Sequence, residues 1–436
     1  MLEYFFSNRY ENRGDLFEGL NIWKEEKFRK LQGTYPVIFL SFAGVKADNY
    51  QDAGKGIKKQ LVKVYSSFPE ILMNESFDRN EEAALTKISE DMEDIDAQYS
   101  LNLLTTLLEK YYNHKVLIFL DEYDTPLQEA YVYGYWDELV SFIRTMFNNT
   151  FKTNPSLERA VMTGIPRVSK ESIFSDLNNL TVVTTTSDKY ATSFGFTEAE
   201  VFAAMDDQGI PETEKEKVKY WYDGFIFGSV KDIYNPWSVT SYLEERKYDT
   251  HWANTSGNGL VSKLIREGNT DIKSDFEELL KGGVIDAEID EQIVYSQLEE
   301  DENTIWSLLL ASGYLKVVGI IREQAEDLPV YRLSITNYEI KRMFSKMVKG
   351  WFQKEKALSK FVSAMLQGDV KSMNRYMNRV ALNTFSYFDA GNKPSHSKEP
   401  ERFYHGFVLG LIVDKADDYM VKSNRESGYG RYDVVM

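Results

Sequence analysis

The sequence contains no cysteine, and this absence removes several kinds of chemistry at once. Disulfide bonds, cysteine-ligated zinc and thiol catalysis are all excluded. Histidine is scarce as well, because the chain has only His114, His251, His396 and His405, at no spacing typical of a metal site. A histidine-rich metal centre is therefore not expected.

Long apolar runs are also missing. The longest apolar candidate, Phe407–Val413, is far shorter than the roughly 20 residues that a membrane-spanning helix needs. Met1–Asn8 has neither a basic region nor a long apolar core, so it does not indicate a signal peptide. We therefore expect a cytoplasmic protein without a membrane partner.

Basic residues are fewer than acidic ones, which gives a formal net charge of −17. Nucleic acids and anionic membranes repel such a chain overall, although a locally basic cleft stays open. The apolar fraction of 43% is high enough for large cores, so a disordered protein is excluded. A chain of 436 residues has room for two or three domains.

The most informative stretch is Val116–Asp124, in which five apolar residues run straight into Asp121 and Glu122. A short, unbroken apolar run predicts a strand buried on both faces, and parallel sheets bind ligands beyond the carboxyl ends of such strands. A Walker B strand is built in this way: its first acid helps to hold Mg²⁺ and its second orients the attacking water. The alternative is a core strand that ends in a solvated acidic turn.

The partner motif of a Walker B strand, G-x-x-x-x-G-K-[ST], occurs nowhere in the sequence. The nearest candidate is Gly54-Lys55-Gly56, but Asn49 replaces the first glycine of the motif and Gly56 its Ser or Thr. We interpret these residues as a loop that leads into a helix around Ile57–Tyr65, not as a phosphate site.

The first 200 residues alternate between segments typical of strands and of helices, which favours a parallel α/β sheet. The expected strands are Pro36–Phe42, Val116–Leu120, Arg159–Gly164 and Thr181–Thr186, and the expected helices include Leu101–Tyr112 and Trp136–Phe147.

Helices should dominate from about residue 196 to 285, beginning with Thr197 as N-cap and Glu200 completing a capping box. Residues 222–228 and 234–238 look like aromatic turns between these helices, most simply a packed aromatic corner. Further on we expect two short strands, Val317–Ile321 and Val330–Ser334, then a polar helical stretch, and finally a helix and two strands in residues 399–436.

Several strings together resemble one family. They are Val116–Asp124, residues 163–167 (TGIPR) with 170–174 (KESIF) and 177–180 (LNNL), Tyr234–Ser238, and residues 404–407 (YHGF) with 430–433 (GRYD). The chain resembles, over essentially its whole length, the bacterial AAA-ATPase-like proteins that carry a C-terminal PD-(D/E)XK nuclease-like domain.

The resemblance implies four regions. Residues 1–195 would be an AAA-ATPase-like α/β domain, a P-loop-type parallel sheet that lacks its Walker A strand. Residues 196–285 would be a helical lid, 286–395 a winged-helix-like and helical linker region, and 396–436 a partial α+β nuclease-like domain. In the family the Walker A motif lies just before the helix that residues 1–6 resemble. The chain is therefore expected to be truncated at both ends, with a gap in the sheet or with neighbouring strands closed up.

The resemblance also assigns roles in the ATPase part. Asp121 would be the acid on the Mg²⁺ side, Glu122 the catalytic base and Thr163 a sensor near the γ-phosphate or water. Arg167 would contact phosphate or another domain, and Pro236 would touch the nucleotide. For Thr163 and Arg167 an alternative has equal weight. Thr163 would be a strand-end threonine that bonds its own backbone, and Arg167 would be an ordinary surface residue.

In the nuclease-like part, Glu401 resembles the helical acid and Asp433 the strand acid that holds Mg²⁺; the alternative for Asp433 is a turn-side aspartate at a strand entry. No Glu-x-Lys strand follows Asp433, so nuclease activity is not expected.

The resulting hypothesis is an ATP-binding regulatory protein that is coupled to a nuclease-like domain, with ATP and Mg²⁺ as cofactors and with both active sites impaired. Nucleic acid stays open as a partner of the C-terminal region. Two alternatives are a nuclease or DNA-defence protein whose ATPase part is a scaffold, and a non-enzymatic interaction protein.

Overall fold

The computed structural model describes residues 1–74, 76–165, 177, 180–254, 259–291, 304–322, 328–352, 363–375, 422–427 and 430–435. The chain forms two compact units. Unit 1 comprises Met1–Val182 and Glu291–Glu300, and unit 2 comprises Val183–Asp290 and Asp301–Met436.

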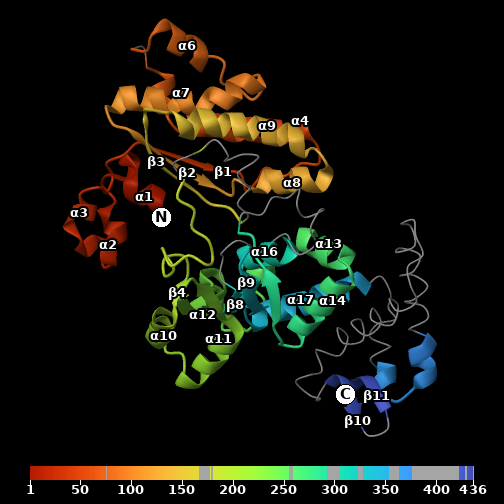
Figure 1. The fold of residues 1–436 in the computed structure, drawn as a ribbon. Coiled ribbons are helices and arrows are strands. Elements are labelled where there is room, and N and C mark those ends of the chain that lie inside the picture. Colours follow the sequence, from red (N-terminus) through yellow and green to blue (C-terminus); the bar gives the residue numbers. More distant parts are fainter. Residues whose placement is uncertain are drawn as a thin grey trace. The chain divides into compact units, whose positions relative to one another are not determined.

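Unit 1 is built on a parallel sheet of three strands, β1 (Val37–Ser41), β2 (Val116–Asp121) and β3 (Leu157–Met162), in the order β1-β2-β3 (Figure 1). The apolar run predicted β2 correctly because every residue from Val116 to Leu120 is buried. The three strands are contiguous, so the expected gap does not lie between them. Within the described part of the chain, β3 is an edge strand that pairs with β2 alone.

Helices cover both faces of this sheet. On one face, α4 (Tyr50–Ser66) lies against β1, α7 (Asp94–Tyr112) against β2, and α9 (Trp136–Phe147) against α7 (Figure 1). On the other face, Phe6 of α1 (Leu2–Phe6) packs against Val37, Leu117 and Phe119. The remaining elements of unit 1 are η1 (Asn8–Tyr10), η2 (Gly14–Phe17), α2 (Asn21–Lys24), α3 (Glu26–Arg29), α5 (Pro69–Leu72), α6 (Arg79–Leu85), α8 (Thr125–Tyr133) and η3 (Asn148–Lys152).

Two predictions in this part of the chain were wrong. Gly54–Gly56 is not a loop but lies inside α4, which begins at Tyr50 because the Asn49 side chain caps it by accepting from the Asp52 amide. Thr181–Thr186 is not a strand. The Ser187 hydroxyl accepts from the Thr184 amide, so this segment closes into a turn, and a β-branched composition alone does not supply a pairing partner.

Among its described residues, unit 2 contains two three-stranded sheets, β4-β6-β5 and β7-β9-β8, and an antiparallel pair, β10 and β11. Its strands are β4 (Phe196–Thr197), β5 (Asp223–Phe227), β6 (Val230–Tyr234), β7 (Ile285–Glu288), β8 (Leu315–Arg322), β9 (Val330–Ile335), β10 (Lys422–Ser427) and β11 (Gly430–Val435). Its helices are α10 (Glu198–Asp207), η4 (Glu212–Glu214), α11 (Lys215–Tyr222), α12 (Pro236–Glu245), η5 (Trp252–Asn254), α13 (Gly259–Glu267), α14 (Thr270–Leu280), α16 (Thr304–Ala311) and α17 (Tyr338–Phe352).

In unit 2 the sequence predicted helix α10 and several later strands correctly, but it did not predict the hairpin of the first sheet. Thr197 and Glu200 form the expected capping box of α10, and β8, β9 and the last two strands lie where they were expected. Residues 222–228, however, which were expected to form a turn between helices, hold strand β5, and β5 pairs with β6 in a hairpin. Residues 234–238 lie at the end of β6 and the start of α12. The aromatic corner is nevertheless present, because Tyr222 and Tyr234 are completely buried in one apolar cluster.

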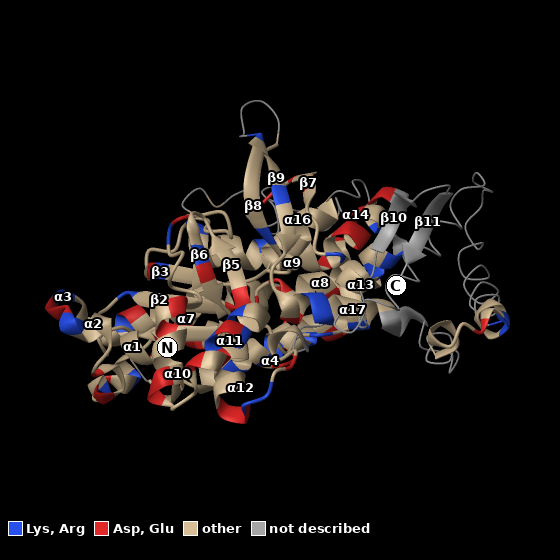
Figure 2. Cartoon of the chain, turned by 90° about the horizontal axis from the view of Figure 1, so that it is seen from below, with Lys and Arg blue, Asp and Glu red and all other residues tan. Residues whose placement is uncertain are grey.

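Charge is unevenly distributed along the helices of unit 2. All the charged residues of α10 are acidic, whereas those of α17 are mainly Lys and Arg (Figure 2). None of the helices that the structure describes combines the length and the apolar character that crossing a bilayer requires.

Candidate functional site

Polar side chains gather where the parallel strands of unit 1 end. Ser41 and Asp121 are register partners at the ends of β1 and β2, and Thr163 follows β3 directly. Because the strands are parallel, their carboxyl ends lie at one edge of the sheet, where α/β proteins bind ligands. The structure therefore brings together three residues that are far apart in the sequence.

Asp121 and Thr163 are in direct contact. The Thr163 hydroxyl donates to Asp121 Oδ1 over 2.5 Å. The backbone fixes this pair, since the Thr163 amide donates to the Leu120 carbonyl and the Tyr123 amide donates to the Thr163 carbonyl. The alternative in which the Thr163 hydroxyl bonds its own backbone is thus not the arrangement found. Asp121 keeps its second carboxylate oxygen for another partner.

Glu122 occupies an unusual backbone conformation. Its φ of 50° is in the left-handed region, which side chains other than Gly, Asn and Asp rarely adopt. The Glu122 carboxylate is exposed and accepts from the Thr125 hydroxyl over 3.0 Å. Such strain immediately after a strand is typical of positions where function fixes the backbone. Sequence analysis missed Thr125, because a threonine at the first position of a helix carries no signal of its own.

Asp124 is also part of this edge, and sequence analysis missed its role. Its side chain is 4% exposed, and Oδ2 accepts from the Ile165 amide over 3.0 Å. Burial raises the pKa of Asp124 to about 6, and the charges of Glu122 and Asp121 act in the same direction, while the hydrogen bond from Ile165 opposes them. An ionised carboxylate at this position is costly, so its presence needs a reason.

The first 174 residues of the chain match a family model. Residues 1–174 match the family described as "Predicted AAA-ATPase". The chain is also similar to an uncharacterized protein in the vnfD 5′ region of Azotobacter chroococcum mcd 1, with 24% identity over 231 residues, which cover 52% of this chain. The matched segment spans 41% of that protein. No solved structure matches the chain. At the coarse level these findings support an ATPase-like first unit.

The residues of this acidic edge fit part of what such a family uses. Carboxylate and hydroxyl oxygens are the ligands that Mg²⁺ prefers, and Asp121, Thr163 and Ser41 supply them. The phosphate side is different, because the sequence holds no G-x-x-x-x-G-K-[ST] string and Gly54–Gly56 is helical. The oxygen atoms of these three side chains therefore suit a divalent cation. The sequence contains no glycine-lysine loop that would bind phosphates.

The described part of unit 1 contains none of the other predicted site residues. Pro236 belongs to unit 2 and is the first residue of α12, where Asn235 caps the helix. Asp433 lies on β11, again in unit 2. Arg167 and Glu401 lie outside the described residues.

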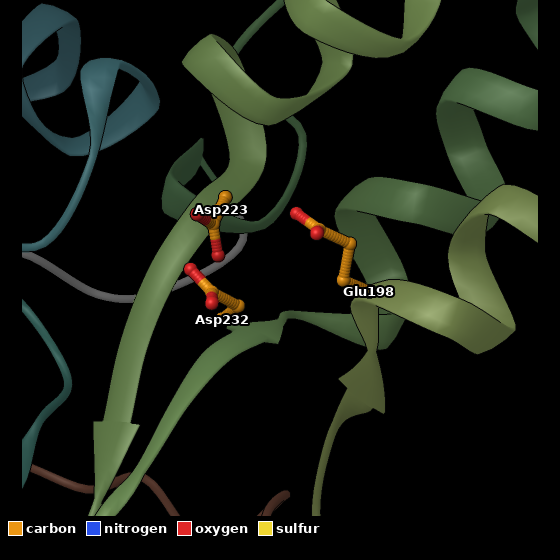
Figure 3. Close-up of side chains that lie close together, drawn as sticks. All are labelled: Glu198, Asp223 and Asp232. Carbon is orange, nitrogen blue, oxygen red and sulfur yellow. The ribbon is translucent and has the colours of Figure 1, made fainter.

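A second group of carboxylates, which sequence analysis did not find, lies in unit 2. Glu198 from α10, Asp223 from β5 and Asp232 from β6 point toward one another, with one carboxylate oxygen of each within 4.8 Å of the others (Figure 3). Lys219 of α11 forms ion pairs with Glu198 and, over 3.7 Å, with Asp232. The group therefore already contains its own cation.

Burial also makes the charged forms of this group less favourable. Burial raises the pKa of Asp223 to about 6, with a further contribution from the neighbouring charge of Asp232. Burial lowers the pKa of Lys316 on β8, although Asp223 and Asp232 oppose that shift. Glu198, Lys219, Asp223, Asp232 and Lys316 thus form an ion network that joins two helices and three strands of unit 2. These residues are too far apart in the sequence to be recognised as one group.

Proposed function

We propose that unit 1 binds a magnesium–nucleotide complex at the carboxyl edge of its parallel sheet, with ATP as the nucleotide. One observation carries this proposal: Asp121 ends a buried strand, Glu122 follows it, and the hydroxyl of Thr163, directly after the neighbouring strand, donates to Asp121 over 2.5 Å. This is the arrangement that a metal-side acid and a water-orienting acid need in ATP-hydrolysing proteins. The match of residues 1–174 to a predicted AAA-ATPase family supports the same function.

Each residue has a defined task in this proposal. Asp121 accepts the Thr163 hydroxyl with one oxygen and offers the other to Mg²⁺, which would neutralise phosphate charge when bound. Glu122 is exposed beyond the strand end and is oriented by Thr125, so it can take a proton from a water molecule. Thr163 fixes the direction of the Asp121 carboxylate. Arg167 and Pro236 remain proposed contacts to phosphate and nucleotide.

We expect ATP hydrolysis by this chain to be weak or absent. The 436 residues supply no glycine-lysine loop to hold the β- and γ-phosphates, and that loop provides most of the phosphate contacts in P-loop proteins. The function of the chain would then depend on nucleotide binding and not on turnover. In this proposal, residues 196–285 act as a lid and 286–395 as a winged-helix-like linker.

The coupling to a nuclease-like C-terminal region belongs to the same proposal. Asp433 on a strand of an antiparallel pair is consistent with a nuclease-type metal acid, and Glu401 would be its helical partner. Mg²⁺-dependent cleavage of DNA that persists in Asp433→Asn would contradict this role of Asp433.

Calorimetric titration with ATP and Mg²⁺ tests the proposed binding site. We expect wild-type protein to bind with a dissociation constant below about 100 μM, or roughly 5.5 kcal/mol, and Asp121→Asn to weaken binding at least about tenfold. Asp137→Asn is the matched control, because Asp137 is an exposed acid in the first turn of α9. No detectable binding by the wild type, or equal affinity in Asp121→Asn, would reject the site.

A further inference from the structure

Asp124 is a buried charged residue to which the proposed chemistry gives no task. It occupies the N-cap position of α8, yet its side chain makes no capping bond to that helix. Instead, Oδ2 accepts from the Ile165 amide over 3.0 Å. The carboxylate therefore joins the turn after β2 to the chain segment after β3.

The surroundings of Asp124 are built closely around this bond. A Cβ atom on Gly164 would lie 2.6 Å from Asp124 Oδ1 and 2.7 Å from the ring of Tyr123, so only glycine fits between the two segments. On the other side of Gly164, the Thr163 hydroxyl reaches Asp121. Residues 163–165 thus form both the hydrogen bond to Asp124 and the hydrogen bond to Asp121, the proposed metal ligand.

A buried carboxylate contributes little to the free energy of unfolding by itself. Its desolvation is costly, and an uncharged side chain of similar shape would avoid that cost. Because Asp124 is 4% exposed, its value must lie in what it holds in place. What it holds is the segment from which Thr163 contacts Asp121.

We propose that Asp124 is a positioning residue whose carboxylate ties residues 163–165 to the turn after β2 and thereby keeps the Thr163 hydroxyl on Asp121. This inference rests on the proposed function for its purpose, since it assigns the residue that controls the geometry of the nucleotide site. The tether is a contact between two parts of the chain, so it can be tested without a nucleotide.

Hydrogen exchange on the unliganded protein tests the tether. In Asp124→Ala we expect the Ile165 amide to exchange at least about tenfold faster than in the wild type, because it loses a charge-assisted bond. Asp124→Asn keeps an acceptor oxygen and should restore exchange to within about threefold of the wild type. Tyr65→Phe is the matched control: it removes another buried hydrogen bond of unit 1, from Tyr65 to the Ser100 carbonyl, without touching this segment.

The outcomes separate the two proposals. Unchanged exchange in Asp124→Ala, exchange as fast in Asp124→Asn as in Asp124→Ala, or an equal effect of Tyr65→Phe would overturn the tether. Magnesium–ATP titrations then test its purpose: Asp124→Ala should bind at least about threefold more weakly, and Asp124→Asn like the wild type. If the Ile165 amide exchanged faster in Asp124→Ala while the affinity for magnesium–ATP stayed unchanged, the positioning role would be overturned. A wild type that binds no nucleotide would reject the proposed function, whatever the exchange result.

Discussion

Thr163 and Asp121 share a 2.5 Å hydrogen bond across the ends of two neighbouring parallel strands. The bond depends on β3 continuing in register past Met162, because the Thr163 amide still donates to the Leu120 carbonyl. The hydrogen bond engages Oδ1 of the Asp121 carboxylate and fixes the orientation of that side chain. The contact is therefore a sensitive point at which to test the site.

Replacing Thr163 by Val should weaken binding of the magnesium–ATP complex about threefold to tenfold, since Asp121 loses the donor that orients it. Thr163→Ser keeps the hydroxyl and should bind like the wild type. Thr145→Val is a suitable control, because it removes a threonine hydroxyl that bonds only the Ser141 carbonyl on α9. Calorimetric titration of the four proteins measures the effect, and equal affinities of the Val and Ser variants would count against it.

The sequence predicted the strands of unit 1 where burial leaves a clear pattern. Val116–Leu120 is buried throughout, so its apolar run marks β2 without ambiguity. Thr181–Thr186 has the composition of a strand, but strand formation depends on a pairing partner, and here the hydroxyl groups close a turn instead. Local composition therefore located the buried elements and failed where tertiary pairing decided the outcome.

The same distinction holds for the site. The position of Asp121 and Glu122 at the end of a buried strand was predictable, because an apolar run that leads into two acids is a local signal. Their roles stay predictions. Nothing in the sequence distinguishes an aspartate that caps its own helix from Asp124, which instead bonds the next segment. The carboxylate group of unit 2 was not predictable for a related reason, since its members come from separate elements and are brought together by the fold.

Glu122→Gly should stabilise unit 1 by about 0.5–1 kcal/mol, because glycine adopts the left-handed conformation without the penalty that glutamate incurs there. The φ of Glu122 is 50°. Asn113→Gly is the matched control at φ 51°, where the gain should be smaller because asparagine tolerates this region. Exchange of the buried β2 amides in urea reports the stability of unit 1 alone. A destabilised Glu122→Gly would show that the conformation carries no strain.

The stability of unit 1 should also depend on pH through Asp124. Its folded pKa, about 6, lies above the ordinary value of 3.8, so the fold favours the protonated acid. The stability from this residue is fully present below about pH 4 and is lost as the pH rises through about 6, by at most about 3 kcal/mol. Asparagine cannot ionise.

The comparison of Asp124→Asn with the wild type isolates this effect. The difference in unfolding free energy between the variant and the wild type should grow in favour of the variant from pH 4.5 to pH 7.5. Urea unfolding at several pH values, again followed by exchange of the β2 amides, measures it. A difference that stays constant with pH would mean that Asp124 is not protonated within this range in the folded protein.

Lys219 should matter more for unit 2 than its partly exposed position suggests. It is the cation that contacts both Glu198 and Asp232, next to Asp223. Lys219→Met leaves three neighbouring carboxylates without this partner and should destabilise unit 2 by about 1 kcal/mol at pH 8. At pH 5 the loss should be smaller, because the raised pKa of Asp223, about 6, keeps that acid protonated and uncharged.

The direction of this pH dependence distinguishes the network from an ordinary surface ion pair. Lys217→Met, which removes an exposed pair with Glu214, should have a smaller effect on the stability of unit 2, and that effect should be the same at both pH values. Exchange of the β5 and β6 amides in urea reports both variants. If Lys219→Met destabilised unit 2 equally at pH 5 and pH 8, Asp223 would carry the same charge at both, and the raised pKa that follows from its burial beside Asp232 would be wrong.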